Sequence, residues 1–407
     1  MTMLSIVIPA YNEEKGIAEI AHRVLATQPA LANVGVEELE LLVVDDGSSD
    51  NTVPIMEQLQ ANFANLRLIK HRHNKGYGAA LKTGFGHACG DLIGFLDADG
   101  TYPPEYFPDL CGATFNGADL VIGSRMQGSA SDMPTTRRIG NIFFAALLSL
   151  LARQRVTDSA SGMRVFRKDL LQRLYPLPDG LNLTPVMSTR AIHEGIKVVE
   201  IPIPYSERVG RSKLSVVRDG SIFLQSMVWT AMMYNPVRIL GMIGLAGIIL
   251  SLLIVLWIIF LRAQGVTTLD TIGVAAVFLA AITGFAGFSI FTLGISFNYL
   301  VSLFYREPIR QGLFGRPLFS VPLDRHFWWM GGLALLAGLV LGLVSLFLGV
   351  RGWDVTRLWL YMLASAMLIL TGIQLLIYWI QLRALEELNQ RDSLVIKDMI
   401  SEEIVSK

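Results

Sequence analysis

The sequence predicts an α/β domain with a mostly parallel sheet, followed by an interfacial segment and a four-helix membrane domain. Residues 1–220 alternate apolar, strand-like runs with helical patterns, as in parallel sheets covered by helices on both faces. The rest of the chain contains four long runs without charge. Of the 407 residues, 52% are hydrophobic and only 17% are charged, against about 25% charged in an ordinary soluble domain. Part of the chain therefore belongs in a membrane.

Strand and helix patterns alternate from the N-terminus. "LSIVIPAYN" is a β-branched run, and residues 13–26 carry apolar side chains at helical spacing. "LELLVVDD" predicts a second strand before a helix that begins near Thr52. "LRLIKHRH" and a helix over residues 79–89 form a third unit, and "DLIGFLDADG" is a fourth strand. Ligands of open α/β sheets lie at the carboxyl ends of the strands, so we expect the site there.

The later elements lead towards the membrane. "ADLVIGSR" predicts a strand ending at Arg125, and an unusually apolar helix covers residues 139–152. "DSASGMRVFRKDLL" turns into a further element, and "KVVEIPIPYSERVGRSKLS" reads as a last strand with a basic loop. The segment 221–236 combines apolar residues with Met and Trp just before the first membrane run. Such a segment is expected to lie in the membrane interface.

Four transmembrane helices are predicted, at about residues 239–261, 272–304, 327–350 and 358–382. Each run exceeds the ~20 residues that cross a bilayer. The loop between the second and third helices is rich in arginine: Arg306, Arg310, Arg316 and Arg325. Positively charged loops stay in the cytoplasm, so we expect residues 1–220 and the tail 384–407 on that side, around a membrane domain over residues 237–383. We see no cleavable signal peptide.

Two aspartates form the strongest candidate site. Asp97 and Asp99 are two residues apart, and in an extended chain such side chains share a face. Close carboxylates repel unless a cation neutralises them, and Mg²⁺ is typically held by few carboxylates together with phosphate oxygens. The pattern alone also allows a solvated Asp-Gly turn. A pair of acid/base carboxylates is less favoured, because neighbours on one strand are poorly placed to flank a bond.

Cationic residues could complement phosphate groups. They are found in a glycine turn, at a strand end, before the apolar helix and in the basic loop: Lys75, Arg125, Arg137, Arg138, Arg208, Arg211 and Lys213. Each alone could be a solvated surface charge, but three groups fall at strand ends or before membrane-facing elements.

The six histidines have no zinc spacing, and "GYGAAL" lacks the third glycine of a dinucleotide fingerprint. The two cysteines, Cys89 and Cys111, are expected to be thiols.

The ordered motifs resemble those of a known family. "VIPAYNEE", "VVDDGSSDNT", "NKGYGAALKTG", "DADGTYPPE", "GSR", "DSASGMRVF" and "GRSKL" resemble the family 2 glycosyltransferases of the GT-A fold, in the branch of polyisoprenyl-phosphate glycosyltransferases and dolichol-phosphate mannose synthases. The resemblance covers about residues 3–220. It implies transfer of a sugar, with inversion, from a UDP- or GDP-linked donor to undecaprenyl or dolichyl phosphate at the membrane.

The resemblance also implies roles for matching positions. The metal positions, for Mg²⁺ or Mn²⁺, are Asp97, Asp99 and Thr101. The donor positions are Pro9, Tyr11, Glu13, Val44, Asp46, Lys75 and Ala98. The positions for phosphate groups of donor and acceptor are Arg125, Arg208, Arg211 and Lys213. Mannose synthases have Gln at the place of Thr101. In their motif "RxxGxSK", one more residue separates the arginine from the lysine than separates Arg208 from Lys213 here. Both differences weaken a GDP-mannose assignment, and the second leaves open whether Arg208 or Arg211 binds the acceptor.

The expected reaction needs no general base, because a phosphate monoester, with its second pKa near ~6, is already a nucleophile at neutral pH. The expected partners are the nucleotide sugar, the polyprenyl phosphate and the bilayer, with no nucleic acid; related enzymes suggest a homo-oligomer. Two alternatives remain. A processive polysaccharide synthase would carry a Q-x-x-R-W motif, which the spacing of Gln225 and Trp229 does not supply. A non-catalytic lipid-sugar-binding protein would require a vestigial metal site.

Overall fold

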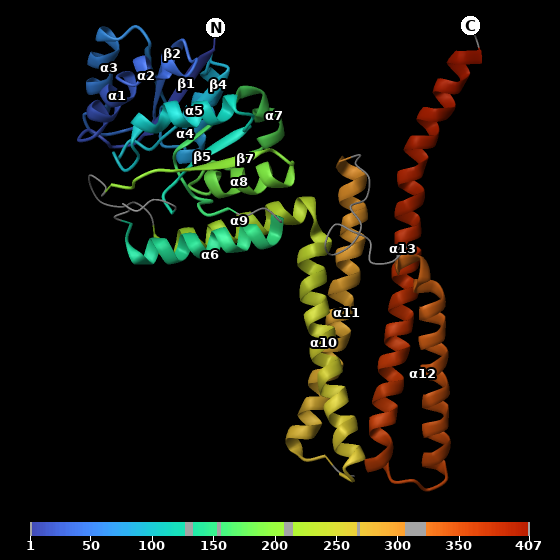
Figure 1. Cartoon of the computed structure of the whole chain (residues 1–407). Coiled ribbons are helices and arrows are strands. Elements are labelled where there is room, and N and C mark those ends of the chain that lie inside the picture. Colours follow the sequence, from blue (N-terminus) through green and yellow to red (C-terminus); the bar gives the residue numbers. More distant parts are fainter. Residues whose placement is uncertain are drawn as a thin grey trace. The chain divides into compact units, whose positions relative to one another are not determined.

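The computed structural model describes residues 2–126, 133–152, 156–206, 215–266, 269–305 and 323–405. The chain divides into two compact units, Met1–Ala231 and Met232–Lys407. The first unit holds the sheet and the helices around it, and the second holds the long apolar helices (Figure 1).

A seven-stranded sheet forms the centre of the first unit, in the order β3-β2-β1-β4-β6-β5-β7. The strands are β1 (Met3–Ala10), β2 (Glu38–Asp45), β3 (Leu66–Lys70), β4 (Leu92–Phe95), β5 (Leu120–Ser124), β6 (Arg164–Arg167) and β7 (Val198–Pro202). All neighbouring pairs are parallel except those that involve β6, which runs antiparallel to β4 and β5. The predicted α/β class with a mostly parallel sheet is confirmed.

Helices cover both faces of this sheet. Successive side chains of β1 point to opposite faces, so Ile6 and Ile8 join one buried cluster and Val7 joins the other. Helices α1 (Ile17–Leu25) and α5 (Phe107–Phe115) contribute to the first cluster. Helices α4 (Tyr77–His87) and α8 (Leu183–His193) contribute to the second. Helix α3 (Thr52–Asn62) follows β2, as predicted.

Several elements differ from the sequence prediction. Short helices α2 (Gln28–Asn33) and α7 (Leu171–Leu174), as well as α5 and α8, were not predicted. Strand β4 ends at Phe95, so Asp97 and Asp99 follow the strand, with Asp99 in a turn. The expectation of a continuous extended segment that places both carboxylates on one face of a strand is therefore not met. The turn arises where "DG" ends the apolar run, and Gly100 has a φ of 73°.

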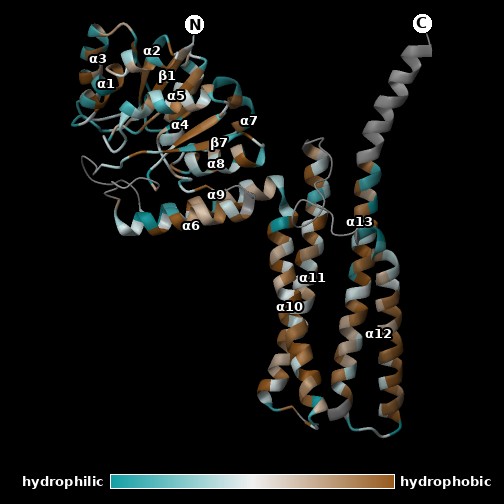
Figure 2. Cartoon of the chain, in the orientation of Figure 1, coloured by the Kyte–Doolittle hydropathy of each residue, from teal (hydrophilic) through white to brown (hydrophobic). Residues whose placement is uncertain are grey.

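Two amphipathic helices complete this unit: α6 (Thr135–Ala152) and α9 (Val216–Tyr234). Their buried sides meet, since Leu148 and Met227 share a small core cluster and the rings of Phe144 and Phe223 lie 5.8 Å apart. The opposite side of α6 leaves large apolar side chains exposed: Ile139, Ile142, Phe143 and Leu150. The polar residues of α6 gather in its first turn, and the rest of the helix is mostly hydrophobic (Figure 2).

Among the described residues, the second unit holds four long helices: α10 (Pro236–Ala263), α11 (Thr271–Tyr305), α12 (Phe327–Val350) and α13 (Val355–Val405). In the same described part of the chain, four segments are long and apolar enough to cross a membrane: Pro236–Ala263, Thr271–Ser302, Asp324–Val350 and Leu358–Leu388. Glycines allow close contact between α10 and α11, because a Cβ on Gly244 would lie 2.5 Å from the carbonyl oxygen of Gly287. Hydrophobic residues dominate these helices in Figure 2. The exact domain boundaries given above remain predictions.

Candidate active site

A pocket of about 500 Å³ lies at the carboxyl ends of the central strands. Strands β2, β1 and β4 are parallel neighbours, so the residues that follow them meet at one edge of the sheet. Many of the predicted site residues line this pocket: Pro9, Tyr11, Glu13, Asp46, Asp97, Ala98, Asp99, Thr101 and Arg125. The fold therefore brings together most of the side chains that the sequence singled out.

Two further predicted site residues, Val44 and Lys75, do not line the pocket. Val44 is fully buried in β2 and packs in the core. Lys75 contributes its backbone N–H to Asp46, and its side chain is not part of the pocket lining. Arg208, Arg211 and Lys213 lie outside the described residues. Their functional roles remain predictions.

Asp46 is a buried carboxylate with several donors. Its Oδ1 accepts the backbone N–H of Lys75 (2.9 Å) and lies 2.7 Å from Nδ1 of His71. Its Oδ2 accepts the backbone N–H of Gly76 (2.8 Å). The second ring nitrogen of His71 lies 2.9 Å from the hydroxyl of Thr83 in α4. Asp46 thus fixes the turn before α4 while it borders the pocket.

Asp97 and Asp99 are each held by a hydroxyl group. The Tyr77 hydroxyl donates to Asp97 Oδ1 at 2.8 Å. The Thr101 hydroxyl and backbone N–H donate to Asp99 Oδ1 at 2.6 and 3.1 Å. Thr101, predicted as a metal position, is thus engaged with the neighbouring carboxylate.

The donor set suits a hard cation that is shared with a phosphate. Within the described part of the chain, no three His, Cys, Asp or Glu side chains gather as a metal-binding group. The pocket nevertheless holds the carboxylates of Asp97 and Asp99. Mg²⁺ sites commonly use one or two carboxylates and take other oxygens from phosphate and water. The residues therefore fit the predicted metal.

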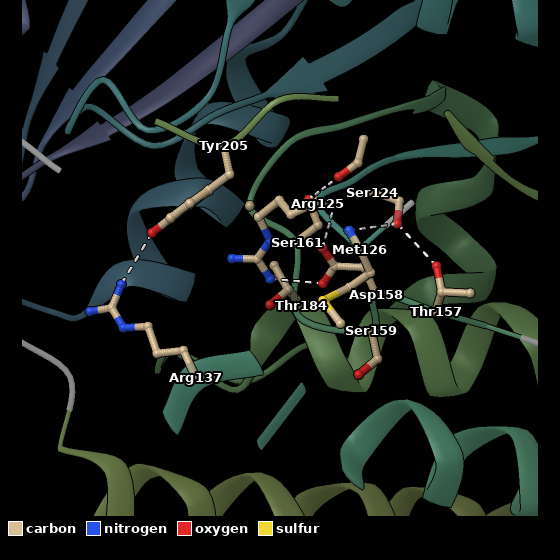
Figure 3. Close-up of polar contacts among 12 residues, drawn as sticks. Ser124, Arg125, Met126, Arg137, Thr157, Asp158, Ser159, Ser161, Thr184 and Tyr205 are labelled. Carbon is tan, nitrogen blue, oxygen red and sulfur yellow. Dashed lines mark hydrogen bonds and ion pairs between the residues drawn. The ribbon is translucent and has the colours of Figure 1, made fainter. Parts of the chain in front are cut away.

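Arg125 forms a buried, two-pronged ion pair with Asp158 (Figure 3). Its Nε donates to Oδ2 of Asp158 and its Nη2 donates to Oδ1, each at 2.8 Å. Its backbone N–H also donates to Oδ2, at 3.0 Å. Burial alone would lower the pKa of Arg125, but the Asp158 charge holds it above its ordinary value. Burial alone would raise the pKa of Asp158, but Arg125 keeps it below its ordinary value. Both groups are therefore charged.

Two tyrosines flank the Arg125 guanidinium. Its central carbon lies 5.7 Å from the ring of Tyr102 and 5.6 Å from the ring of Tyr205, which are distances for cation–π attraction. The Tyr205 hydroxyl accepts a hydrogen bond of 3.2 Å from Arg137 of α6 (Figure 3). Tyr205 thereby links Arg137 to Arg125, and both arginines line the pocket.

The loop that carries Asp158 is held by Arg164, a fully buried residue of β6. Its Nη2 donates to the Ser159 carbonyl at 2.8 Å, and its Nε donates to the Ser161 carbonyl at 3.1 Å. Burial lowers the pKa of Arg164 to about 10, even though Asp158 opposes the shift. The guanidinium therefore remains charged at neutral pH.

Helices α6 and α9 line the far end of the pocket with residues that the sequence did not single out as a site: Thr136, Gly140, Asn141, Phe144, Gly220 and Phe223. Both amide atoms of Asn141 are buried without a hydrogen-bond partner among the described residues. Asp158 and Tyr77 were also missed, although both lie inside quoted motifs. Their partners are distant in sequence, so no local pattern could identify their contacts.

The fold and the pocket define an α/β protein with a pocket at the carboxyl ends of its strands, where open α/β sheets bind their ligands. The family described as glycosyl transferase family 2 matches residues 5–175, and a domain of unknown function (DUF8752) matches residues 236–396. A dolichyl-phosphate hexose transferase of Haloferax volcanii is 32% identical over 225 residues, covering 55% of this chain and 92% of that protein. The chain belongs to the family 2 glycosyltransferases, as the motifs predicted.

One further relative and one solved structure are also similar to this chain. An undecaprenyl-phosphate 4-deoxy-4-formamido-L-arabinose transferase of Proteus mirabilis is 31% identical over 280 residues, which cover 66% of this chain and 82% of that protein. Among solved structures, a glucosyl-3-phosphoglycerate synthase from Mycobacterium tuberculosis, in complex with Mn²⁺, UDP and phosphoglyceric acid, aligns with a TM-score of 0.44 and 19% identity. That alignment covers 57% of this chain and 78% of the other.

Proposed function

We propose that this protein transfers a sugar from a nucleotide diphosphate to the phosphate of undecaprenyl or dolichyl phosphate, with inversion at the anomeric carbon. The similarity to two polyprenyl-phosphate sugar transferases supports this acceptor class. The observation that carries the proposal is a single pocket that combines carboxylates (Asp97, Asp99), cations (Arg125, Arg137) and residues of the amphipathic helices α6 and α9.

We expect the donor to bind at the sheet edge. The nucleoside would lie against Pro9, Tyr11 and Glu13, with Asp46 at the same end of the pocket. Asp97 and Asp99 would hold Mg²⁺ or Mn²⁺, which when bound stabilises the charge of the leaving diphosphate. A panel of donors distinguishes between a UDP- and a GDP-linked sugar.

The acceptor phosphate supplies the nucleophile. One of its oxygens forms the new bond to the anomeric carbon as the bond from that carbon to the diphosphate oxygen breaks. Since the dianion needs no deprotonation, the protein has to orient it and to offset the repulsion between two phosphate-bearing substrates. Arg125 and Arg137 carry charges of the required sign in the pocket. Arg208, Arg211 and Lys213 are proposed to add to them.

The membrane provides the acceptor. The exposed side chains of Ile139, Ile142 and Phe143 on α6 are suited to insertion at the headgroup level, which would place the α6 end of the pocket near the lipid phosphate. The arginine-rich loop between the second and third predicted spans supports a cytoplasmic catalytic unit. Self-association into a homo-oligomer remains part of the proposal.

Purified full-length protein in vesicles tests this function. We expect transfer of radiolabelled sugar from one of UDP-glucose, UDP-GlcNAc, UDP-galactose or GDP-mannose to undecaprenyl or dolichyl phosphate, and loss of transfer with EDTA. Asp99→Asn should abolish transfer, whereas Asp109→Asn, which changes an exposed carboxylate of α5, should not. Absence of transfer with every donor, in folded protein, contradicts the proposal. Long polymer formed from donor alone would favour a processive synthase.

A further inference from the structure

The Asp97 carboxylate is confined by two residues that the proposed chemistry has not yet used. Tyr77 donates its hydroxyl to Oδ1 at 2.8 Å. Gly162 lies against the same carboxylate, since an added Cβ would come within 2.6 Å of Oδ2 and 2.8 Å of Cγ and Oδ1. All three residues line the pocket. Little freedom therefore remains for the orientation of this carboxylate.

Tyr77 is held in place by the backbone of its neighbours on both sides. It is the first residue of α4, directly after Lys75 and Gly76, whose N–H groups bind Asp46. The following N–H groups, of Gly78 and Ala79, donate to the Asp179 carbonyl at 2.7 and 3.1 Å. Consecutive residues of one short segment thus contact Asp46 after β2, Asp97 after β4 and the chain near Asp179.

Gly76 makes this segment possible. Its φ of 104° is a conformation that side chains disfavour, and a Cβ there would lie 2.6 Å from the Asp179 carbonyl oxygen. The turn can therefore approach Asp179 closely and direct the Tyr77 ring towards Asp97.

The Gly162 side is also fixed. The backbone N–H of Gly162 donates to the Tyr102 hydroxyl at 2.7 Å. Tyr102 is buried, and its ring packs edge-on against Tyr205 at 6.3 Å. This hydrogen bond holds the main chain at Gly162 against the Asp97 carboxylate.

We propose that Tyr77 is a positioning residue that orients the Asp97 carboxylate for the divalent cation, while the close approach of Gly162 limits the other orientations of that carboxylate. The inference rests on the metal site of the proposed function. Hydrogen bonds to metal-ligating carboxylates commonly set the ligand's orientation, and their removal typically weakens metal binding or activity by about 10- to 100-fold. Tyr77 would thereby also couple the nucleoside end of the pocket, at Asp46, to the metal end.

The test measures Mn²⁺ binding to the full-length protein, without substrates, from the loss of the free Mn²⁺ signal in electron paramagnetic resonance. Tyr77→Phe removes only the hydroxyl, and we expect Mn²⁺ to bind at least about tenfold more weakly. Gly162→Ala should weaken binding independently, because its methyl group is directed at the same carboxylate. Tyr175→Phe is the matched control, since Tyr175 packs in the same core cluster as Tyr77 but does not line the pocket.

Each outcome has a distinct meaning. If the wild-type protein binds Mn²⁺ and Asp97→Asn abolishes binding, but Tyr77→Phe binds as the wild type does, the inference is wrong and the metal site stands. Equal weakening by Tyr77→Phe and Tyr175→Phe would also overturn it, because the effect would then be general loosening of the core. A wild-type protein that binds no Mn²⁺, even when UDP is added to supply phosphate oxygens, would instead contradict the proposed metal site.

Discussion

Asp158 carries a carboxylate that is fully buried, and both of its oxygens accept hydrogen bonds of 2.8 Å from the guanidinium of Arg125. A third bond comes from the Arg125 backbone N–H. The arginine that the sequence suggested as a phosphate ligand is thus first the partner of an acid 33 residues away. Only Nη1 of its guanidinium takes no part in this ion pair.

Asp158→Asn should therefore destabilise the catalytic unit. The variant keeps the shape of the side chain but leaves the buried Arg125 charge uncompensated, and removing one partner of a buried pair typically costs about 3–5 kcal/mol. Thermal or chemical unfolding in detergent measures this loss. Glu105→Gln is the control, since Glu105 also forms a two-pronged pair, with Arg23, but at the surface. Such pairs contribute about 1 kcal/mol or less, and equal losses in the two variants would contradict the prediction.

The contribution of this pair should depend on pH in the acid range. The pKa of Asp158 is lower in the folded protein than its ordinary value of about 3.9. The unfolded chain therefore takes up the proton first, and the stabilisation is complete above about pH 5 and declines as the pH falls below about 4. We expect the difference in unfolding free energy between the wild type and Asp158→Asn to be constant from pH 7 to 5 and to shrink below that. A difference that grows on acidification would refute this assignment.

Thr101 should support the metal through Asp99. Thr101→Val removes the hydroxyl that donates to Asp99 Oδ1 and preserves the shape of the side chain. We expect about tenfold weaker Mn²⁺ binding and a parallel fall in transfer rate, whereas Thr101→Ser should stay close to the wild type. Isothermal titration with Mn²⁺ separates the two. A serine variant as impaired as the valine variant would show that the methyl group, and hence packing, matters instead.

We predict that Asn141 contributes to acceptor binding and lowers the stability of the folded protein. A buried polar group without a partner typically costs about 1–3 kcal/mol, and both amide atoms of Asn141 are in this position among the described residues. Asn141→Leu should therefore raise the melting temperature and, because Asn141 borders the proposed acceptor end, raise the KM for polyprenyl phosphate. The KM for the nucleotide sugar should not change. A variant that is both less stable and fully active would contradict this prediction.

The exposed face of α6 should matter only for acceptors in a membrane. Phe143→Glu places a charge on that face. If the phenyl group of Phe143 is buried in the bilayer, its loss costs about 1.5–3 kcal/mol of membrane binding. We expect at least about a tenfold rise in the KM for long polyprenyl phosphate in vesicles and no change with a short, water-soluble prenyl phosphate. Phe115→Glu, on the exposed side of α5, is the matched control. An equal effect of the two variants would indicate a general defect.

By itself, the sequence determined the alternation of strands and helices, the acidic residues after β2 and β4 and the four apolar runs. These features are local, because periodicity, charge and turn residues are written into consecutive positions. The ordered motifs also determined the family. From the motifs, the metal and nucleotide positions could only be predicted. A motif indicates which residues contact a ligand, but it does not show which contacts position those residues.

Only the tertiary structure decided how the site is supported. Strand β6 has four residues, too few for a pattern that shows its direction, yet it runs antiparallel between β4 and β5. Its insertion brings Gly162 against Asp97 and Asp158 against Arg125. Tyr77 reaches Asp97 across 20 residues because the turn at Gly76 directs the start of α4. Such contacts depend on strand order and chain direction, which a sequence specifies only through the whole fold.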